Sequence, residues 1–223
     1  MKAHVVEHSA YRWWDRWLSD GRVPHLLTVD VESGAMRDLF AGTRYELARA
    51  DPTAHLYDIS PDGREIAFSF DPAEDKRFDH SYQLVALDLA RKRFRTLTAR
   101  SALNHETPSY SPDGRWIALV TQDLRKSPVD TQRLALVDRR GGKLTVATSR
   151  WDRSVVPPLV WSGDSAAVHF IAEDNARQHL FRFGIGKRLP EIVAQGGVVS
   201  DFDVAGDAIA YVRNDMSTPP GVF

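Results

Sequence analysis

The 223-residue sequence contains no cysteine, which excludes disulfides, thiolate catalysis and zinc sites built on cysteine. It also lacks any apolar run near the ~18 residues of a membrane-spanning helix. The first residues, MKAHVVEHSAYRW, form no apolar h-region, so we expect no signal peptide. These absences predict a soluble chain without membrane contact, and they leave the compartment open between cytoplasm and periplasm.

An excess of charge of one sign is missing as well. Lys and Arg number 29 against 30 Asp and Glu, so the net charge is -1. A balanced chain has no electrostatic reason to bind a polyanion, and we expect no nucleic-acid partner. The 43% of hydrophobic residues is ample for a buried core.

Two nearly identical stretches, DISPDGREIAFSF from Asp58 and SYSPDGRWIALVT from Ser109, stand 51 residues apart. In Ser-Pro-Asp-Gly, proline presets φ at the second turn position, and Asp and Gly suit the third and fourth. The residues after the turn alternate as in a strand, with Ile66, Phe68 and Phe70 on one face. Two further copies, LVWSGDSAAVHFIA and the shorter FDVAGDAIAYVRN, make this a repeat whose aligned positions are spaced by 51, 51 and 41 residues: Ile66, Ile117, Val168 and Ile209.

A second hairpin motif alternates with the first. Its leading strand often ends in Asp before a short turn, as at Asp30, Asp88 and Asp138. Each repeat therefore holds about four strands, and a period of ~40–50 residues with four strands is typical of a β-propeller blade. The predicted fold is all-β, a β-propeller of four-stranded antiparallel blades, and only residues 11–18 could form a turn of helix.

The expected organisation is a single propeller region over 1–223 with about four blades. Partial blades are expected over 1–40 and 199–223, and whole blades over about 55–98, 105–148 and 157–194. We expect an incomplete ring, whose open blade faces favour a homodimer. The alternative is a small closed ring in which 1–40 and 199–223 share one blade.

These residues resemble a known family. SPDG turns before apolar strands, at this period, are similar to the propellers of prolyl oligopeptidase family serine peptidases, and TolB-like propellers share the repeat. The stretches YRWWDRWLSDGRVPHLLTVDVESGAMRDLF (11–40) and YVRNDMSTPPGVF (211–223) resemble the dipeptidyl-peptidase and acylaminoacyl-peptidase branch.

The resemblance implies a non-catalytic propeller that gates access of short peptides to a hydrolase domain. That α/β-hydrolase domain, with its Ser-Asp-His triad, would belong to the same parent chain and is absent from these residues. No catalytic residue transfers to this sequence. The alternative is a stand-alone TolB-like propeller that serves as a protein-interaction scaffold.

A direct search for chemistry finds little. Gly163-Asp164-Ser165-Ala166-Ala167 lacks the final Gly of a nucleophile elbow, so Ser165 is interpreted as a turn residue. None of the eight histidines shows the spacing of a zinc peptidase. We expect neither a metal nor a cofactor, and we expect the acidic loop with Asp71 and Glu74 to be solvated.

The most unusual cluster is aromatic: Trp13, Trp14 and Trp17 surround Asp15. One interpretation is packing between blades. The other is a substrate-facing wall, formed by Trp14, Asp15 and Trp17, between the propeller and the catalytic domain. Both interpretations stay open from the sequence.

Overall fold

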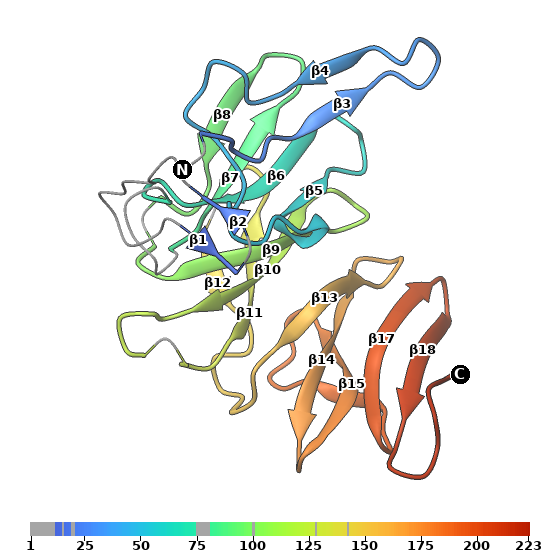
Figure 1. The fold of residues 1–223 in the computed structure, drawn as a ribbon. Coiled ribbons are helices and arrows are strands. Elements are labelled where there is room, and N and C mark those ends of the chain that lie inside the picture. Colours follow the sequence, from blue (N-terminus) through green and yellow to red (C-terminus); the bar gives the residue numbers. More distant parts are fainter. Residues whose placement is uncertain are drawn as a thin grey trace, which may run out of the picture.

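The computed structural model describes residues 12–14, 16–18, 21–74, 81–99, 101–127, 129–141 and 143–223. Strands form nearly all regular structure in these ranges, and the one helical element within them is the 3-10 turn η1 (Ala54–Leu56) (Figure 1). None of the described helical residues forms a span that could cross a bilayer. The predicted all-β fold is confirmed.

Three four-stranded antiparallel sheets, here called blades 1 to 3, follow one another along the chain. Blade 1 comprises β5 (Tyr57–Ile59), β6 (Glu65–Phe70), β7 (Gln83–Asp88) and β8 (Arg93–Thr96). Blade 2 comprises β9 (Asn104–Tyr110), β10 (Trp116–Gln122), β11 (Arg133–Asp138) and β12 (Leu144–Val146). Blade 3 comprises β13 (Val156–Trp161), β14 (Ala167–Asp174), β15 (Arg177–Gly184) and β16 (Glu191–Ala194).

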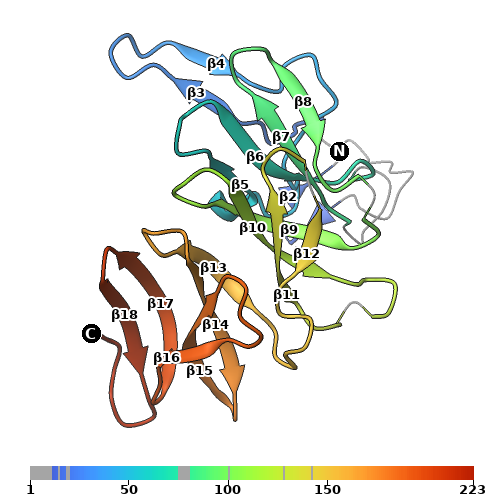
Figure 2. The ribbon, with the colours of Figure 1, turned by 180° about the vertical axis from the view of Figure 1, so that it is seen from behind.

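The first elements are β1 (Arg12–Trp13), β2 (Arg16–Trp17), β3 (Leu27–Val29) and β4 (Met36–Asp38), paired as two hairpins. The C-terminal sheet comprises β17 (Val198–Ala205), β18 (Ala208–Asn214) and β19 (Gly221–Val222). One parallel pair, Gln178 with Val198, connects it to blade 3. The β3–β4 hairpin and the C-terminal sheet lie at the two ends of the row of blades, whereas the β1–β2 hairpin is drawn at the level of β5 and β9 (Figures 1 and 2).

The Ser-Pro-Asp-Gly stretches of blades 1 and 2 and the Ser-Gly-Asp-Ser stretch of blade 3 form the same hydrogen-bonded turn. In blade 1 the Ser60 hydroxyl donates to Asp62 Oδ1 at 2.7 Å and accepts the Glu65 amide at 3.0 Å. Blades 2 and 3 repeat both bonds at Ser111 and Ser162. A buried serine thus closes the turn, which explains why the chain repeats this short stretch.

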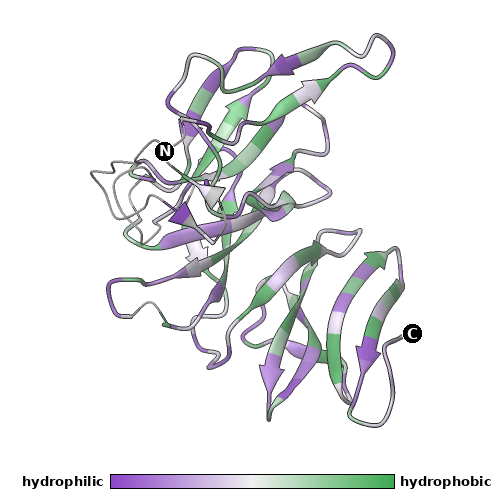
Figure 3. Ribbon diagram, viewed as in Figure 1, coloured by the Kyte–Doolittle hydropathy of each residue, from purple (hydrophilic) through white to green (hydrophobic). Residues whose placement is uncertain are grey.

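Apolar clusters fill every interface between neighbouring sheets, because both faces of each blade are covered. Ile66 and Phe68 of β6 face the β3–β4 side, whereas Ala67 faces blade 2, as the alternation predicts. The central strands β6 and β7 are accordingly largely hydrophobic (Figure 3). The hydropathy of both strand faces is therefore a consequence of stacking.

Polar contacts fix how each blade sits on the preceding one. The residue before the turn serine reaches back in both cases: Tyr110 Oη donates to Glu65 at 2.6 Å, and Trp161 Nε1 donates to the Ser109 carbonyl at 3.0 Å. Arg139 of blade 2 forms a bidentate pair with Asp62 of blade 1, both distances 3.0 Å. These directional bonds set the angle between blades, which apolar packing alone leaves loose.

We expect Arg139→Ala to lower the free energy of unfolding by about 1–3 kcal/mol, because it removes the pair with Asp62 and a 3.3 Å contact to the partly buried Glu65. The Arg139 guanidinium also holds the pKa of the Asp62 carboxyl well below its ordinary value. Urea denaturation measures the change. Arg140→Ala is the matched control, since this exposed neighbour should cost under ~0.5 kcal/mol. Equal losses for both variants would contradict the interblade role.

Two expectations were wrong. Residues 12–17 contain the two-residue strands β1 and β2 in place of a helical turn, and Trp14 between them has φ 52°. Asp71 and Glu74 are buried, not solvated. Their carboxylates accept hydrogen bonds from the backbone amides of Ala73, Ser81 and Arg49. These bonds offset the desolvation cost of burying the two carboxylates.

Candidate functional site

The first strands of the three blades, β5, β9 and β13, converge on a small pocket of about 200 Å³, here called the inner-strand pocket. Each of these strands is an edge strand, because it pairs with only one neighbour in its sheet, and β9 contacts both β5 and β13. The pocket is lined by Ala54, His55, Tyr57, Asp58, Thr107, Pro108, Ser109, Pro157, Pro158 and Leu159. Three successive blades therefore contribute to one opening.

Asp58 is the charged group of this pocket. Its Oδ2 accepts the Tyr110 amide of blade 2 at 2.6 Å, and its Oδ1 accepts the Ile59 amide at 2.8 Å. Burial raises the pKa of the Asp58 carboxyl, and these two hydrogen bonds oppose the rise. Because both oxygens are used by backbone amides, Asp58 holds two blades together at the opening rather than presenting a free base.

Thr107, whose backbone conformation is unusual, also lines the inner-strand pocket. Thr107 has φ 51° in β9, and its buried hydroxyl has no hydrogen-bond partner. A strained residue with an unsatisfied hydroxyl is unusual in a strand interior. Sequence reasoning missed Thr107, because nothing in its local pattern signals a positive φ.

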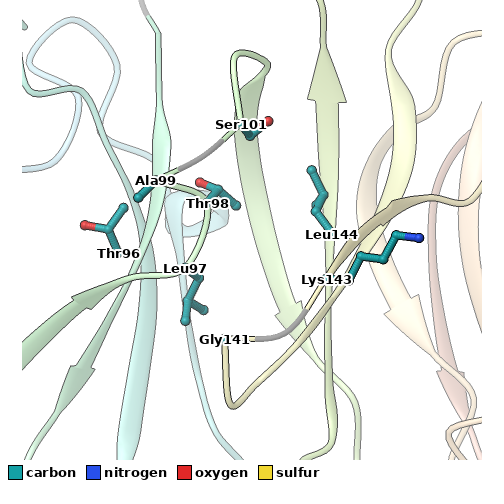
Figure 4. Close-up of a pocket in the computed structure, with 8 residues that line it drawn as sticks. All are labelled: Thr96, Leu97, Thr98, Ala99, Ser101, Gly141, Lys143 and Leu144. Atoms are coloured by element: carbon teal, nitrogen blue, oxygen red, sulfur yellow. The ribbon is translucent and has the colours of Figure 1, made fainter.

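A larger groove of about 800 Å³ lies between the outer parts of blades 1 and 2 (Figure 4). Its lining comes from the segment after β8 and from the turn before β12: Thr96, Leu97, Thr98, Ala99, Ser101, Gly141, Lys143 and Leu144. The lining offers hydroxyls, one ammonium and two leucines but no carboxylate or imidazole. Such a surface can bind a polar chain, but it carries no acid–base pair.

The aromatic residues singled out in the sequence lie at the periphery. Trp14 is 81% exposed and Trp17 is 40% exposed, with the Arg12 guanidinium 5.8 Å from the Trp17 ring. Asp15 lies outside the described residues. Trp14 is therefore not covered by a blade in the described part of the chain, and its role as part of a substrate-facing wall stays a prediction.

Ser165 occupies the turn position that glycine holds in blades 1 and 2. Its φ is 60°, and its Oγ accepts the Asp113 amide of blade 2 at 3.0 Å. The hydroxyl thus joins two turns on neighbouring blades. No group of three metal-ligating side chains occurs among the residues that the structure describes.

The chain is a β-propeller, because it consists of stacked four-stranded antiparallel sheets in which the same turn joins the first and second strands. No protein-family model matches the sequence. The chain is 25% identical, over 98% of its length, to dipeptidyl-peptidase 5 of Porphyromonas gingivalis, and it spans only 33% of that protein.

Solved structures agree on the fold. A puromycin-hydrolyzing peptidase of Mycobacterium tuberculosis matches with a TM-score of 0.64 and 19% identity, over 89% of this chain and 33% of that one. TolB of Acinetobacter baumannii matches with a TM-score of 0.60 and 18% identity, over 89% of this chain and 45% of that one. At such identities the likeness concerns the propeller fold.

Proposed function

We propose that this chain is the propeller part of a serine peptidase that hydrolyses short peptides. In this proposal it gates substrate access to an α/β-hydrolase domain elsewhere in the parent protein. The observation that carries the proposal is the 25% identity to dipeptidyl-peptidase 5, which extends over nearly the whole chain. The matched protein is about three times as long, which leaves ample length for a hydrolase domain.

The described surface fits a gating role better than a catalytic one. Ser165, Asp58 and Glu65 are all committed to hydrogen bonds that hold blades or turns together. The inner-strand pocket, by contrast, is lined by three blades, with polar side chains from blades 1 and 2 and apolar ones from blade 3. A gate needs such an opening and no nucleophile of its own.

The second candidate is a stand-alone propeller that acts as a protein-interaction scaffold. The likeness to TolB favours it, since the fold match covers 89% of this chain. The outer groove of Figure 4 would then be a natural place for a partner segment. Under this alternative no hydrolase domain would accompany the propeller.

An exposed apolar face lies on the β3–β4 hairpin, where Leu27, Val29 and Met36 point away from blade 1. In a complete propeller another blade would cover this face. In the isolated chain the expected homodimer through open blade faces would bury it. That homodimer stays a prediction.

The natural gene product tests the proposal. We expect it to be about three times longer than this chain, to react with a fluorophosphonate probe and to cleave dipeptidyl-nitroanilide substrates. The isolated 223-residue chain should do neither. A natural product that is not labelled by the probe and is inactive on peptides would overturn the peptidase assignment and favour the scaffold.

The aromatic wall gives a further prediction. In the full-length protein, Trp14→Ala should raise the KM for peptide substrates about 3- to 10-fold with little change in kcat. The reason is that Trp14 would stabilise the bound substrate and the transition state equally. The melting temperature should hold, since Trp14 is exposed. Val31→Ala, at another exposed apolar residue, is the control. An unchanged KM would remove Trp14 from the proposed substrate wall.

A further inference from the structure

The repeat supplies an internal comparison for one position on each blade. The two central strands of each blade form a cross-strand pair at an equivalent position, on the face that contacts the next sheet. The pairs are Ala67 with Ala86 in blade 1, Ala118 with Leu136 in blade 2, and His169 with Arg182 in blade 3. The first two pairs are buried and apolar. Among the three blades, only blade 3 has an imidazole and a guanidinium at this pair of positions.

The residue of the next sheet that covers this pair also differs between the blades. Blade 2 covers the first pair with Tyr110, blade 3 covers the second with Trp161, and the C-terminal sheet offers Val204. These three residues occupy equivalent positions of the repeat, because each pairs with the equivalent residue of the following strand. For Val204 that residue is Ile209. A valine in place of a large aromatic leaves space, and a cavity of about 390 Å³ lies there. It is lined by residues of blade 3 and of the C-terminal sheet, the two sheets drawn at the lower right of Figure 1.

His169 contributes an acceptor to this cavity, which we call the blade 3 pocket. The side chain is 3% exposed, and Nδ1 lies 3.3 Å from the Val160 carbonyl. Burial lowers the pKa of the imidazole; the hydrogen bond to the Val160 carbonyl opposes this shift, and the Arg182 cation adds to it, so the balance favours the neutral ring. With Nδ1–H donating to a carbonyl, Nε2 remains as a hydrogen-bond acceptor.

The other lining groups carry both signs of charge. The Arg182 guanidinium lines the pocket, and its charge contributes to the lowered pKa of the neighbouring Asp164 carboxyl. Asp164 and Asp207 supply two carboxylates, and Val193, Val204 and Ile209 form an apolar wall. A simple anion would meet two carboxylates, and a simple cation would meet the guanidinium.

We propose that the blade 3 pocket binds a small zwitterion with an apolar side chain, that is, an apolar α-amino acid. Its carboxylate would pair with Arg182, and its ammonium would donate to His169 Nε2 and Asp164. Its hydrocarbon would lie on the valine and isoleucine wall. The pocket volume falls within the ~300–1,000 Å³ of small-molecule sites. This inference does not depend on the peptidase proposal, because every residue in it belongs to this chain.

Three probes of similar size test the chemistry: L-leucine, isocaproate, which lacks the amine, and isopentylamine, which lacks the carboxylate. NMR titration of the 223-residue chain, with isotope labels on the backbone and on histidine, follows each of them. We expect L-leucine to shift the His169 and Gly206 signals, and to bind about tenfold or more tightly than either half-molecule. No shift with L-leucine, or equal binding by one half-molecule, would overturn the proposal.

Variants taken from the repeat itself locate the site. Arg182→Leu installs the residue that blade 2 has at this position, and it should weaken L-leucine binding about tenfold or more. Val204→Trp installs the aromatic of blade 3 and should block binding while both polar residues remain. Arg188→Gln, in the exposed turn beyond β15, controls for the change in net charge. Unchanged binding in Arg182→Leu and Val204→Trp, with the fold intact, would place the ligand elsewhere.

Discussion

Phe68→Ala should reduce the free energy of unfolding by about 3–5 kcal/mol, the largest single loss that we expect in this chain. The Phe68 ring is fully buried, and its centroid lies 4.8 Å from that of Phe40 and 5.7 Å from that of Tyr45. These rings join β6 of blade 1 to the segment that follows the β3–β4 hairpin. Truncation would leave a cavity that neighbouring aromatic rings cannot fill without breaking their own contacts.

Urea denaturation followed by near-UV circular dichroism would report both the loss and any disorder of the aromatic cluster. Phe223→Ala is the matched control, because the same atoms are removed from a ring that is 51% exposed. It should cost no more than ~1 kcal/mol. A loss below ~1 kcal/mol for Phe68→Ala would mean that this cluster does not hold the hairpin to blade 1.

Acid should destabilise the chain through His105. This side chain is 1% exposed, neither ring nitrogen has a hydrogen-bond partner among the described residues, and burial lowers the pKa of the imidazole to about 4. The unfolded chain, with a pKa near 6.5, binds more protons between these two values. Stability therefore rises with pH from about 4 to 6.5 and is fully present above that window, a contribution of about 3 kcal/mol.

His105→Leu should remove most of this dependence. Between pH 7 and pH 5 the wild type should lose about 2 kcal/mol more than the variant, as measured by urea midpoints at each pH. Leucine has a similar volume and needs no hydrogen bond, so the variant should fold. His55→Gln, at an exposed histidine of η1, should keep the wild-type profile. Identical profiles for wild type and His105→Leu would mean that His105 is hydrated or paired in solution.

The turns between the first two strands of each blade could be predicted from the sequence, because their hydrogen bonds join residues close together in the chain. Ser60, Asp62 and Gly63 lie within four positions, and their hydrogen bonds close a single turn. Ser165 was correctly interpreted as a turn residue for the same reason. The burial of Asp71 and Glu74 was missed, because the amides that satisfy them come partly from distant positions, as with Arg49 and Glu74.

The sequence by itself determined the all-β fold, the repeat and the strand faces. These follow from alternation and turn residues, which act over a few positions. Only the tertiary structure decided which residues meet between blades. Arg139 and Asp62 are 77 positions apart, and their contact depends on how one sheet is placed on the next. The same holds for the blade 3 pocket, since the gap left at Val204 becomes visible only when the sheet carrying it is stacked over His169 and Arg182.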